Sequence, residues 1–236
     1  MAGPVNHASG TSGATAVGDL VVDITASTVG NSMIVLVGEQ TASGATFAVT
    51  DNGGNAYTED ASQKVTSKSY AYVFRAPVTT SATQVTITVT GATGYITADV
   101  FEQAGLASTP LDVTGVGPAA ETDSNAPSIA TSTATAQADE IAYAIIVADN
   151  GDITLSAVTA GWTTEAAVAA SGDTQFSAYQ ELSAVADTLT YAGTLSTSAY
   201  WGGIIVTYKL SASPPPSASA GAWGGGVAMA AGAAWS

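Results

Sequence analysis

Hydrophobic and polar residues alternate with a period of two along most of residues 20–210. The clearest case is residues 84–90, where Val85, Ile87 and Val89 alternate with threonines. A β-strand with one buried face shows this period, because successive side chains point to opposite faces of a sheet. Two continuous apolar runs, 33–37 and 141–148, are of strand length and fall well short of the ~20 residues that span a membrane.

Turn sequences separate these segments at 51–55, 91–94 and 149–152, each rich in glycine, asparagine, aspartate or threonine. Many short strands at such spacing predict an all-β chain, an antiparallel β-sandwich resembling a jelly roll. We expect strands in the first half at 20–25, 33–37, 46–50, 56–60, 69–75, 84–90 and 95–102. We expect strands in the second half at 140–148, 153–158, 162–168, 174–181, 188–192 and 200–209.

The two halves follow the same order of elements, which predicts an internal duplication of two six-strand halves, at about 33–105 and 140–210. Tyr57 aligns near Trp162, and Tyr72 aligns with Tyr179. Chance similarity between two β segments rich in threonine and alanine is the alternative.

Changes in composition along the chain predict the boundaries of an N-terminal arm, a β-sandwich region and a linker. Residues 1–18 are rich in small polar residues and predict a flexible N-terminal arm before a β-sandwich region at 19–210. Residues 112–139, with Pro118 and Pro127, predict a linker between the halves. Residues 1–18 also lack the basic and apolar regions of a secretory signal.

Residues 211–236 form a C-terminal tail with three successive prolines and then alanine, glycine and four large apolar residues: Trp223, Val227, Met229 and Trp235. An exposed large apolar side chain forgoes roughly 1.5–3 kcal/mol relative to burial. We expect these four residues to dock on a neighbouring subunit, with docking on the chain's own sandwich as the alternative.

Charge excludes several function classes. The 236 residues include 19 acidic and 4 basic side chains, which give a formal net charge of -15. Four basic residues cannot neutralise a nucleic-acid backbone, and the negative field disfavours an anionic membrane surface. The chain has no cysteine, and His7 is its one histidine, so a histidine metal cluster or a Ser/His/Asp triad is not expected.

Three further kinds of site were considered: a pair of hydrolytic carboxylates, a calcium site and a sugar-stacking surface. For each, the same residues have a structural explanation. Adjacent carboxylates at 59–60 and 139–140 point to opposite faces of a strand and do not form a hydrolytic pair. Oxygen atoms of residues 51–52 and 149–152 suit calcium, but the same residues are typical of turns. Exposed rings on strands could stack on sugars, although core packing is the commoner role of such residues: Tyr57, Tyr72, Trp162, Tyr179 and Trp201.

Three sequence matches carry a family resemblance. Residues 50–58 read TDNGGNAYT, residues 72–78 read YVFRAPV, and residues 109–112 read TPLD. Together with Tyr200-Trp201 before the last apolar run, they resemble a widespread bacterial and phage β-sandwich module marked by a VTDxxGNxYT hairpin. The resemblance covers about residues 20–210 and implies a fold rather than an activity.

Such modules occur in cell-surface and virion structural proteins. A phage protein leaves the host by lysis and needs no secretory signal. The resemblance therefore implies a non-enzymatic virion structural protein, such as a capsid decoration (cement) or other minor structural protein on the particle surface, without cofactor or metal. We expect it to dock on neighbouring subunits through its termini. Its expected partners are the major capsid protein or neighbouring virion subunits. The sequence leaves open whether the chain also forms a homo-oligomer. The alternative is a carbohydrate-binding or adhesin module of a phage tail or bacterial surface.

Overall fold

The structure, a computed structural model, describes residues 3–40, 46–65 and 69–211. Its regular elements are strands, as the alternation predicted. The first half contains β1 (Asn6–Thr11), β2 (Asp19–Asp23), β3 (Ser32–Gln40), β4 (Thr46–Asp51), β5 (Thr58–Val65), β6 (Ser69–Pro77), β7 (Gln84–Thr90) and β8 (Tyr95–Gln103). The second half contains β9 (Leu106–Gly117), β10 (Asp123–Ser124), β11 (Ser128–Ala130), β12 (Glu140–Ala148), β13 (Leu155–Ser156), β14 (Thr163–Thr164), β15 (Val168–Ala169), β16 (Thr174–Leu182), β17 (Thr190–Ala192), β18 (Thr194–Leu195) and β19 (Ala199–Leu210).

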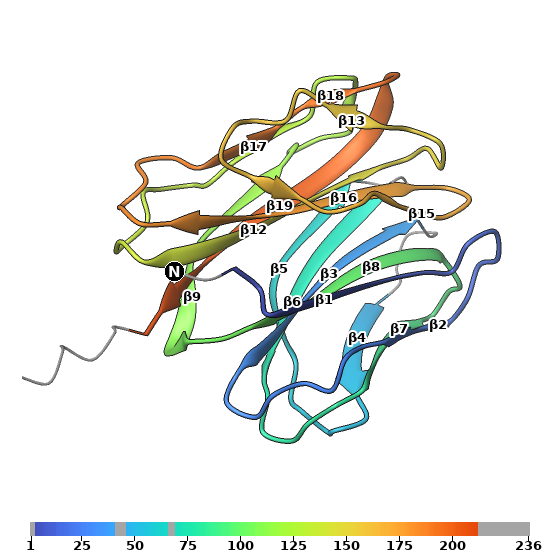
Figure 1. Cartoon of the computed structure of the whole chain (residues 1–236). Coiled ribbons are helices and arrows are strands. Elements are labelled where there is room, and N and C mark those ends of the chain that lie inside the picture. The colour runs from blue at the N-terminus through green and yellow to red at the C-terminus, as the bar shows by residue number, and fades with distance from the viewer. Residues whose placement is uncertain (1–2, 41–45, 66–68, 212–236) are drawn as a thin grey trace, which may run out of the picture.

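The strands form four layers, which makes the molecule two antiparallel sandwiches packed back to back (Figure 1). A three-stranded sheet, β2-β7-β4, covers a five-stranded sheet, β1-β8-β3-β6-β5. The five-stranded sheet packs on a seven-stranded sheet built along β10-β19-β12-β16-β14, with β9 and β15 attached. The pairs β11-β17 and β13-β18 form the fourth layer.

Three hydrophobic cores separate the layers. The first outer core lies under β2, β4 and β7, and the second outer core lies under the short pairs of the fourth layer. The middle core joins the two large sheets and includes Ile34, Leu36, Phe101, Ile145 and Tyr208. The middle core explains the two continuous apolar runs, because β3 and β12 are buried on both faces.

The structure corrects the expected N-terminal arm. Residues 6–11 are not free but form β1, which pairs with β8 along its whole length at the edge of the five-stranded sheet. The strand carries small and polar residues with no apolar alternation, so the hydrophobic pattern does not reveal it. Backbone hydrogen bonds to β8, rather than a buried apolar face, hold it in place.

The expected linker is also corrected, because β9 enters it and β10 and β11 lie within it. β9 pairs with β19 as far as Gly117. At Gly115 the chain passes so close to β11 that a Cβ atom would lie 1.9 Å from the carbonyl oxygen of Ala130. Glycine allows this approach, and glycine inside a strand weakens the sequence signal for that strand.

Parts of the two halves correspond in space. The orders β8-β3-β6-β5 and β19-β12-β16-β14 take the expected elements of each half in the same succession. The backbone N–H of Ser27 donates to Ala82 and its hydroxyl accepts from the Ala82 N–H, and Thr135 and Ala186 repeat both bonds. The pairing of Tyr72 with Tyr179 does not hold, because Tyr72 lies in the first outer core and Tyr179 packs against the middle core. The duplication and a jelly-roll connection stay predictions.

Candidate functional site

The four apolar residues of the tail, Trp223, Val227, Met229 and Trp235, lie outside the described residues. The expected docking contact therefore stays a prediction. The described part of the chain has no helix long and apolar enough to cross a membrane.

The structure does not bring the five candidate stacking aromatics together on one surface. Tyr57 and Tyr72 pack in the first outer core, Trp162 and Trp201 in the second, and Tyr179 against the middle core. Only 2% of Tyr72 and 4% of Trp201 are exposed. Tyr57 donates its hydroxyl to Asp51 at 3.1 Å, and Trp162 donates its indole N–H to the Thr190 carbonyl at 2.8 Å. These residues serve as core contacts, which corrects their candidacy as a common sugar-stacking surface.

The turn at 51–55 uses its carboxylate within the fold. Asp51 accepts from the backbone N–H groups of Gly53 and Asn55, each at 3.0 Å, and from the Asn55 side chain at 2.8 Å. Asn55 accepts in turn from the backbone of Thr79 and Thr80. This network ties the turn to the segment after β6, so the turn interpretation of these residues accounts for their polar atoms. Within the described ranges no group of three or more His, Cys, Asp or Glu side chains could hold a metal ion.

The acidic residues at 59–60 are also used in the fold. Asp60 accepts from the Arg75 Nε at 2.9 Å and from the Tyr208 hydroxyl at 2.8 Å, at the edge of the middle core. The ion pair joins β5 to β6 within the five-stranded sheet, and the hydrogen bond joins β5 to β19 across the two large sheets, so Asp60 is a structural contact between the halves.

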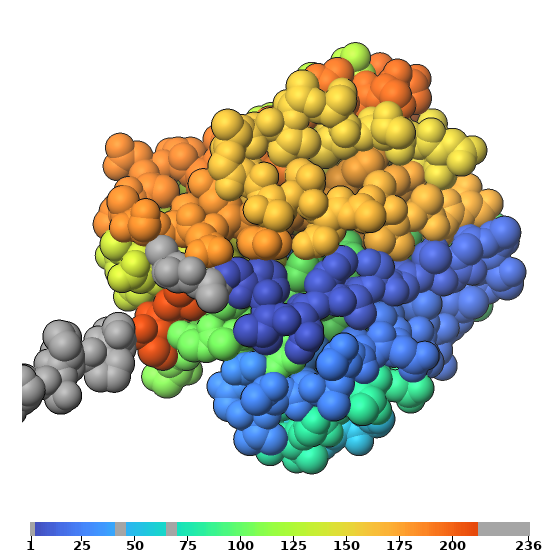
Figure 2. Space-filling model, in the orientation of Figure 1, coloured from blue at the N-terminus to red at the C-terminus, as the bar shows by residue number. Residues whose placement is uncertain are grey.

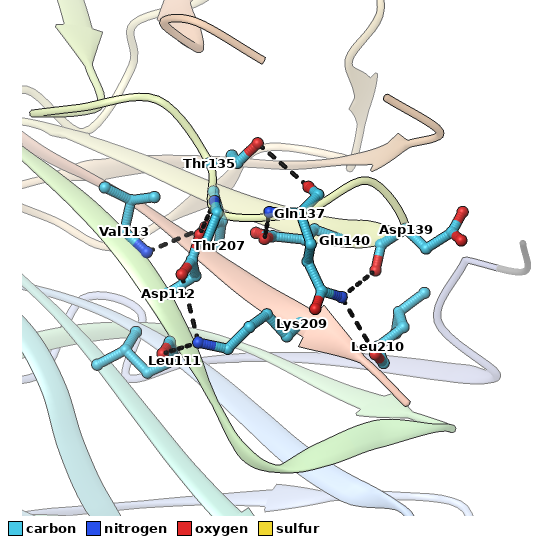
Figure 3. A network of polar contacts seen from close by, with 11 residues as sticks. Leu111, Asp112, Val113, Thr135, Gln137, Asp139, Glu140, Thr207, Lys209 and Leu210 are labelled. Carbon is cyan, nitrogen blue, oxygen red and sulfur yellow. Dashed lines mark hydrogen bonds and ion pairs between the residues drawn. The ribbon is translucent and has the colours of Figure 1, made fainter. Parts of the chain in front are cut away.

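Glu140 lies in a polar network beside β9 and β19 (Figure 3). Burial and the neighbouring Asp112 raise the pKa of Glu140 to about 7. Burial acts to raise the pKa of Asp112, but hydrogen bonds from the Ala136 N–H and from Lys209 outweigh burial, and the pKa is lowered. The Lys209 Nζ lies 3.3 Å from Asp112 Oδ1. Glu140 is fully buried, so no substrate can touch it despite a pKa suited to acid catalysis.

Two further carboxylates lie buried near the ends of β3 and β16. Glu39 and Asp173 are fully buried, and their carboxylate oxygens find no hydrogen-bond partner within the described parts of the chain. Burial, and then Asp173, raises the pKa of Glu39 to about 8, and burial followed by Asp149 does the same for Asp173. Both acids are therefore mainly protonated at neutral pH. The sequence does not distinguish them from surface acids, since their burial depends on how the sheets stack.

The most unexpected group surrounds His7, on the strand that the hydrophobic pattern did not reveal. His7 Nε2 lies 2.7 Å from Asp99 Oδ1, and Nδ1 lies 3.3 Å from Glu165 Oε2. Ser9 donates to the same Asp99 oxygen at 2.9 Å and lies 3.5 Å from His7 Nε2. Histidine, serine and aspartate therefore meet here, where the sequence indicated no such group.

The geometry around His7 is not that of an activated nucleophile. A triad needs the serine hydroxyl to donate to a histidine nitrogen that is free to take its proton. Here the Ser9 hydroxyl donates to Asp99, and a carboxylate faces each histidine nitrogen. Burial lowers the pKa of His7, but the hydrogen bond and charge of Asp99 and the charge of Glu165 outweigh it, and the net shift is upward.

The His7 group instead connects the two halves. Gln175, on β16, donates to Asp99 Oδ2 and to Ser177, each at 2.9 Å. Glu165 lies between β14 and β15 of the second half, whereas His7 and Asp99 lie on β1 and β8 of the first. Figure 2 shows the blue N-terminal residues along the seam beneath the orange residues of the second half.

Comparisons of the chain with protein-family models, curated proteins and solved structures found no significant match. Function is therefore inferred from the chain's own residues and their geometry.

Proposed function

We propose that the protein is a non-enzymatic structural component of a virion, such as a capsid decoration protein, that docks on neighbouring subunits through its C-terminal tail. The proposal rests on one observation: the buried and half-buried polar side chains make structural contacts within the fold. Asp51, Asp60, Asp99 and His7 hold strands, turns and halves together. The middle core adds a continuous apolar contact between two sandwiches, which suits a stiff building block.

The resemblance to phage and surface modules supports the virion setting, and the tail supplies the docking element. Residues 6–11 are engaged in β1, so the N-terminal segment contributes less to docking than the sequence suggested. The large apolar side chains of the tail give it the composition of an interface anchor.

Cosedimentation tests the proposal. Particles of the phage that encodes the protein, assembled without it, are mixed with the full chain, with a version ending at Leu210, and with the full chain carrying Trp223→Ala and Trp235→Ala. We expect the full chain to bind and both variants to lose most binding. Equal binding of all three would overturn the docking role of the tail, and failure of the full chain to bind would overturn the virion role.

A further inference from the structure

A surface cavity of about 550 Å³ opens between one end of the five-stranded sheet and the start of β9. Val29, Pro77 and Leu106 give the cavity an apolar lining, which Ala107 and Pro110 continue along β9. The side chain of Val29 is 62% exposed. The volume falls within the ~300–1,000 Å³ of typical binding pockets, and an exposed apolar lining favours an apolar occupant.

The last described residue of the chain lies beside this cavity. The backbone N–H of Ser211 donates to the Gly105 carbonyl at 2.7 Å, and the Ser211 hydroxyl donates to the Leu106 carbonyl at 2.9 Å. Leu106 lines the cavity, and its backbone also pairs with that of Leu210. The C-terminal tail, residues 212–236, therefore begins at the cavity.

Trp223 is the first large apolar residue of the tail, and it follows Ser211 by twelve residues. A chain of that length spans at most roughly 40 Å. A short tether gives its end an effective concentration on the order of millimolar at a nearby site, and this concentration falls as the tether lengthens. The cavity of the same chain is therefore favoured over that of a second copy, and Trp223 is favoured over Trp235.

Charge does not oppose a contact between the tail and the cavity. Residues 212–236 contain no charged side chain, so the tail approaches a protein of net charge -15 without repulsion. Arg75 is the charged side chain of the described lining, and its Nε lies 2.9 Å from Asp60 Oδ2. Because that ion pair already neutralises Arg75, the cavity suits an uncharged group.

We propose that Trp223 occupies this cavity of its own chain when the protein is free in solution. The indole ring packs on Val29, Pro77 and Leu106, which removes apolar surface of both partners from water. The contact does not rest on a virion role. A neighbouring subunit that binds the tail has to displace Trp223 from the cavity, so the contact keeps the tail from binding until a partner competes for it.

Paramagnetic relaxation enhancement in the isolated full chain tests the proposal. The chain has no cysteine, so Ala222→Cys provides a single site for a nitroxide next to Trp223. We expect strong broadening of the Val29 and Leu106 methyl signals and little at Leu195, in the fourth layer. Adding Trp223→Ala to the labelled chain is expected to lower the ratio of docked to undocked tail about tenfold or more.

Matched variants separate the cavity from general effects on the tail or the fold. Trp235→Ala is expected to leave the broadening unchanged. Val29→Gln is expected to reduce the broadening at Leu106, whereas Val21→Gln, at a side chain 52% exposed on β2, is expected to have no effect. Broadening that is the same with and without Trp223 would refute the contact.

A mixed sample separates the chain's own cavity from that of a second copy. Isotope-labelled protein without the nitroxide is mixed with nitroxide-labelled protein that gives no NMR signal. We expect no broadening at Val29 or Leu106 in this mixture, and broadening there would assign the cavity to a second copy and overturn the proposal. A failure of the full chain to bind capsids would count against the proposed function alone, since these experiments contain no capsid.

Discussion

The imidazole of His7 lies between two carboxylates from opposite halves of the molecule, 2.7 Å from Asp99 and 3.3 Å from Glu165. The raised pKa of His7 means that the folded protein binds its proton more tightly than the unfolded chain. The contribution of His7 to stability is therefore complete below the unfolded pKa of about 6.5 and is lost as pH rises through the folded pKa.

We predict that His7→Ala lowers the free energy of unfolding by about 1.5–3 kcal/mol near pH 5, the usual range for hydrogen bonds to charged groups. The difference from wild type should shrink as pH rises through the folded pKa. Urea unfolding of both proteins from pH 5 to pH 9 measures this. A difference that grows with pH would contradict the bridging role.

Glu140 changes stability with pH in the same direction as His7, because its pKa is also raised in the folded state, but the physical cause is the cost of a buried charge. Between its usual value near 4.5 and about 7, the folded state binds more protons than the unfolded state, so stability falls as pH rises. We predict that Glu140→Gln flattens this fall, by an amount on the order of 1–3 kcal/mol. Thermal unfolding from pH 4 to pH 8 gives the comparison, with Glu121→Gln as a control at an exposed acid. Parallel profiles for wild type and Glu140→Gln would show that burial of Glu140 carries no such cost.

The Asp51 turn should be sensitive to loss of its carboxylate. Asp51→Ala leaves the N–H groups of Gly53 and Asn55 without their acceptor, so we expect a loss of about 2–3 kcal/mol in chemical unfolding. Asp19→Ala removes an exposed carboxylate from β2 and should change stability by less than about 0.5 kcal/mol. Calcium should leave the wild-type melting temperature unchanged, and a clear rise with calcium would favour the ion-binding interpretation of this turn.

The middle core should make the two halves unfold together. Ile145 is fully buried in that core, and Ile145→Ala is expected to cost about 2–5 kcal/mol. Calorimetry should show one transition in both proteins, with the variant shifted to lower temperature. Val21→Ala, at a side chain 52% exposed on β2, is the control and should shift little. Two separate transitions in wild type would show that the halves are independent.

The local sequence pattern by itself determined the all-β class and the positions of several strands. Alternation predicted the strand at 84–90 and a continuous apolar run predicted the strand at 140–148, each with the bounds that the structure has, since both signals lie within the segment itself. Composition also identified the acidic, cysteine-free character of the chain and the apolar tail.

Tertiary structure decided the rest, because those features depend on contacts between distant residues. β1 and β9 carry weak or absent apolar alternation and exist through ladders with β8 and β19. His7 meets Asp99 because β1 pairs with β8, and it meets Glu165 because the two large sheets pack face to face. The burial of Tyr72 and Trp201 depends on which layer covers each strand, and a period of two does not encode that.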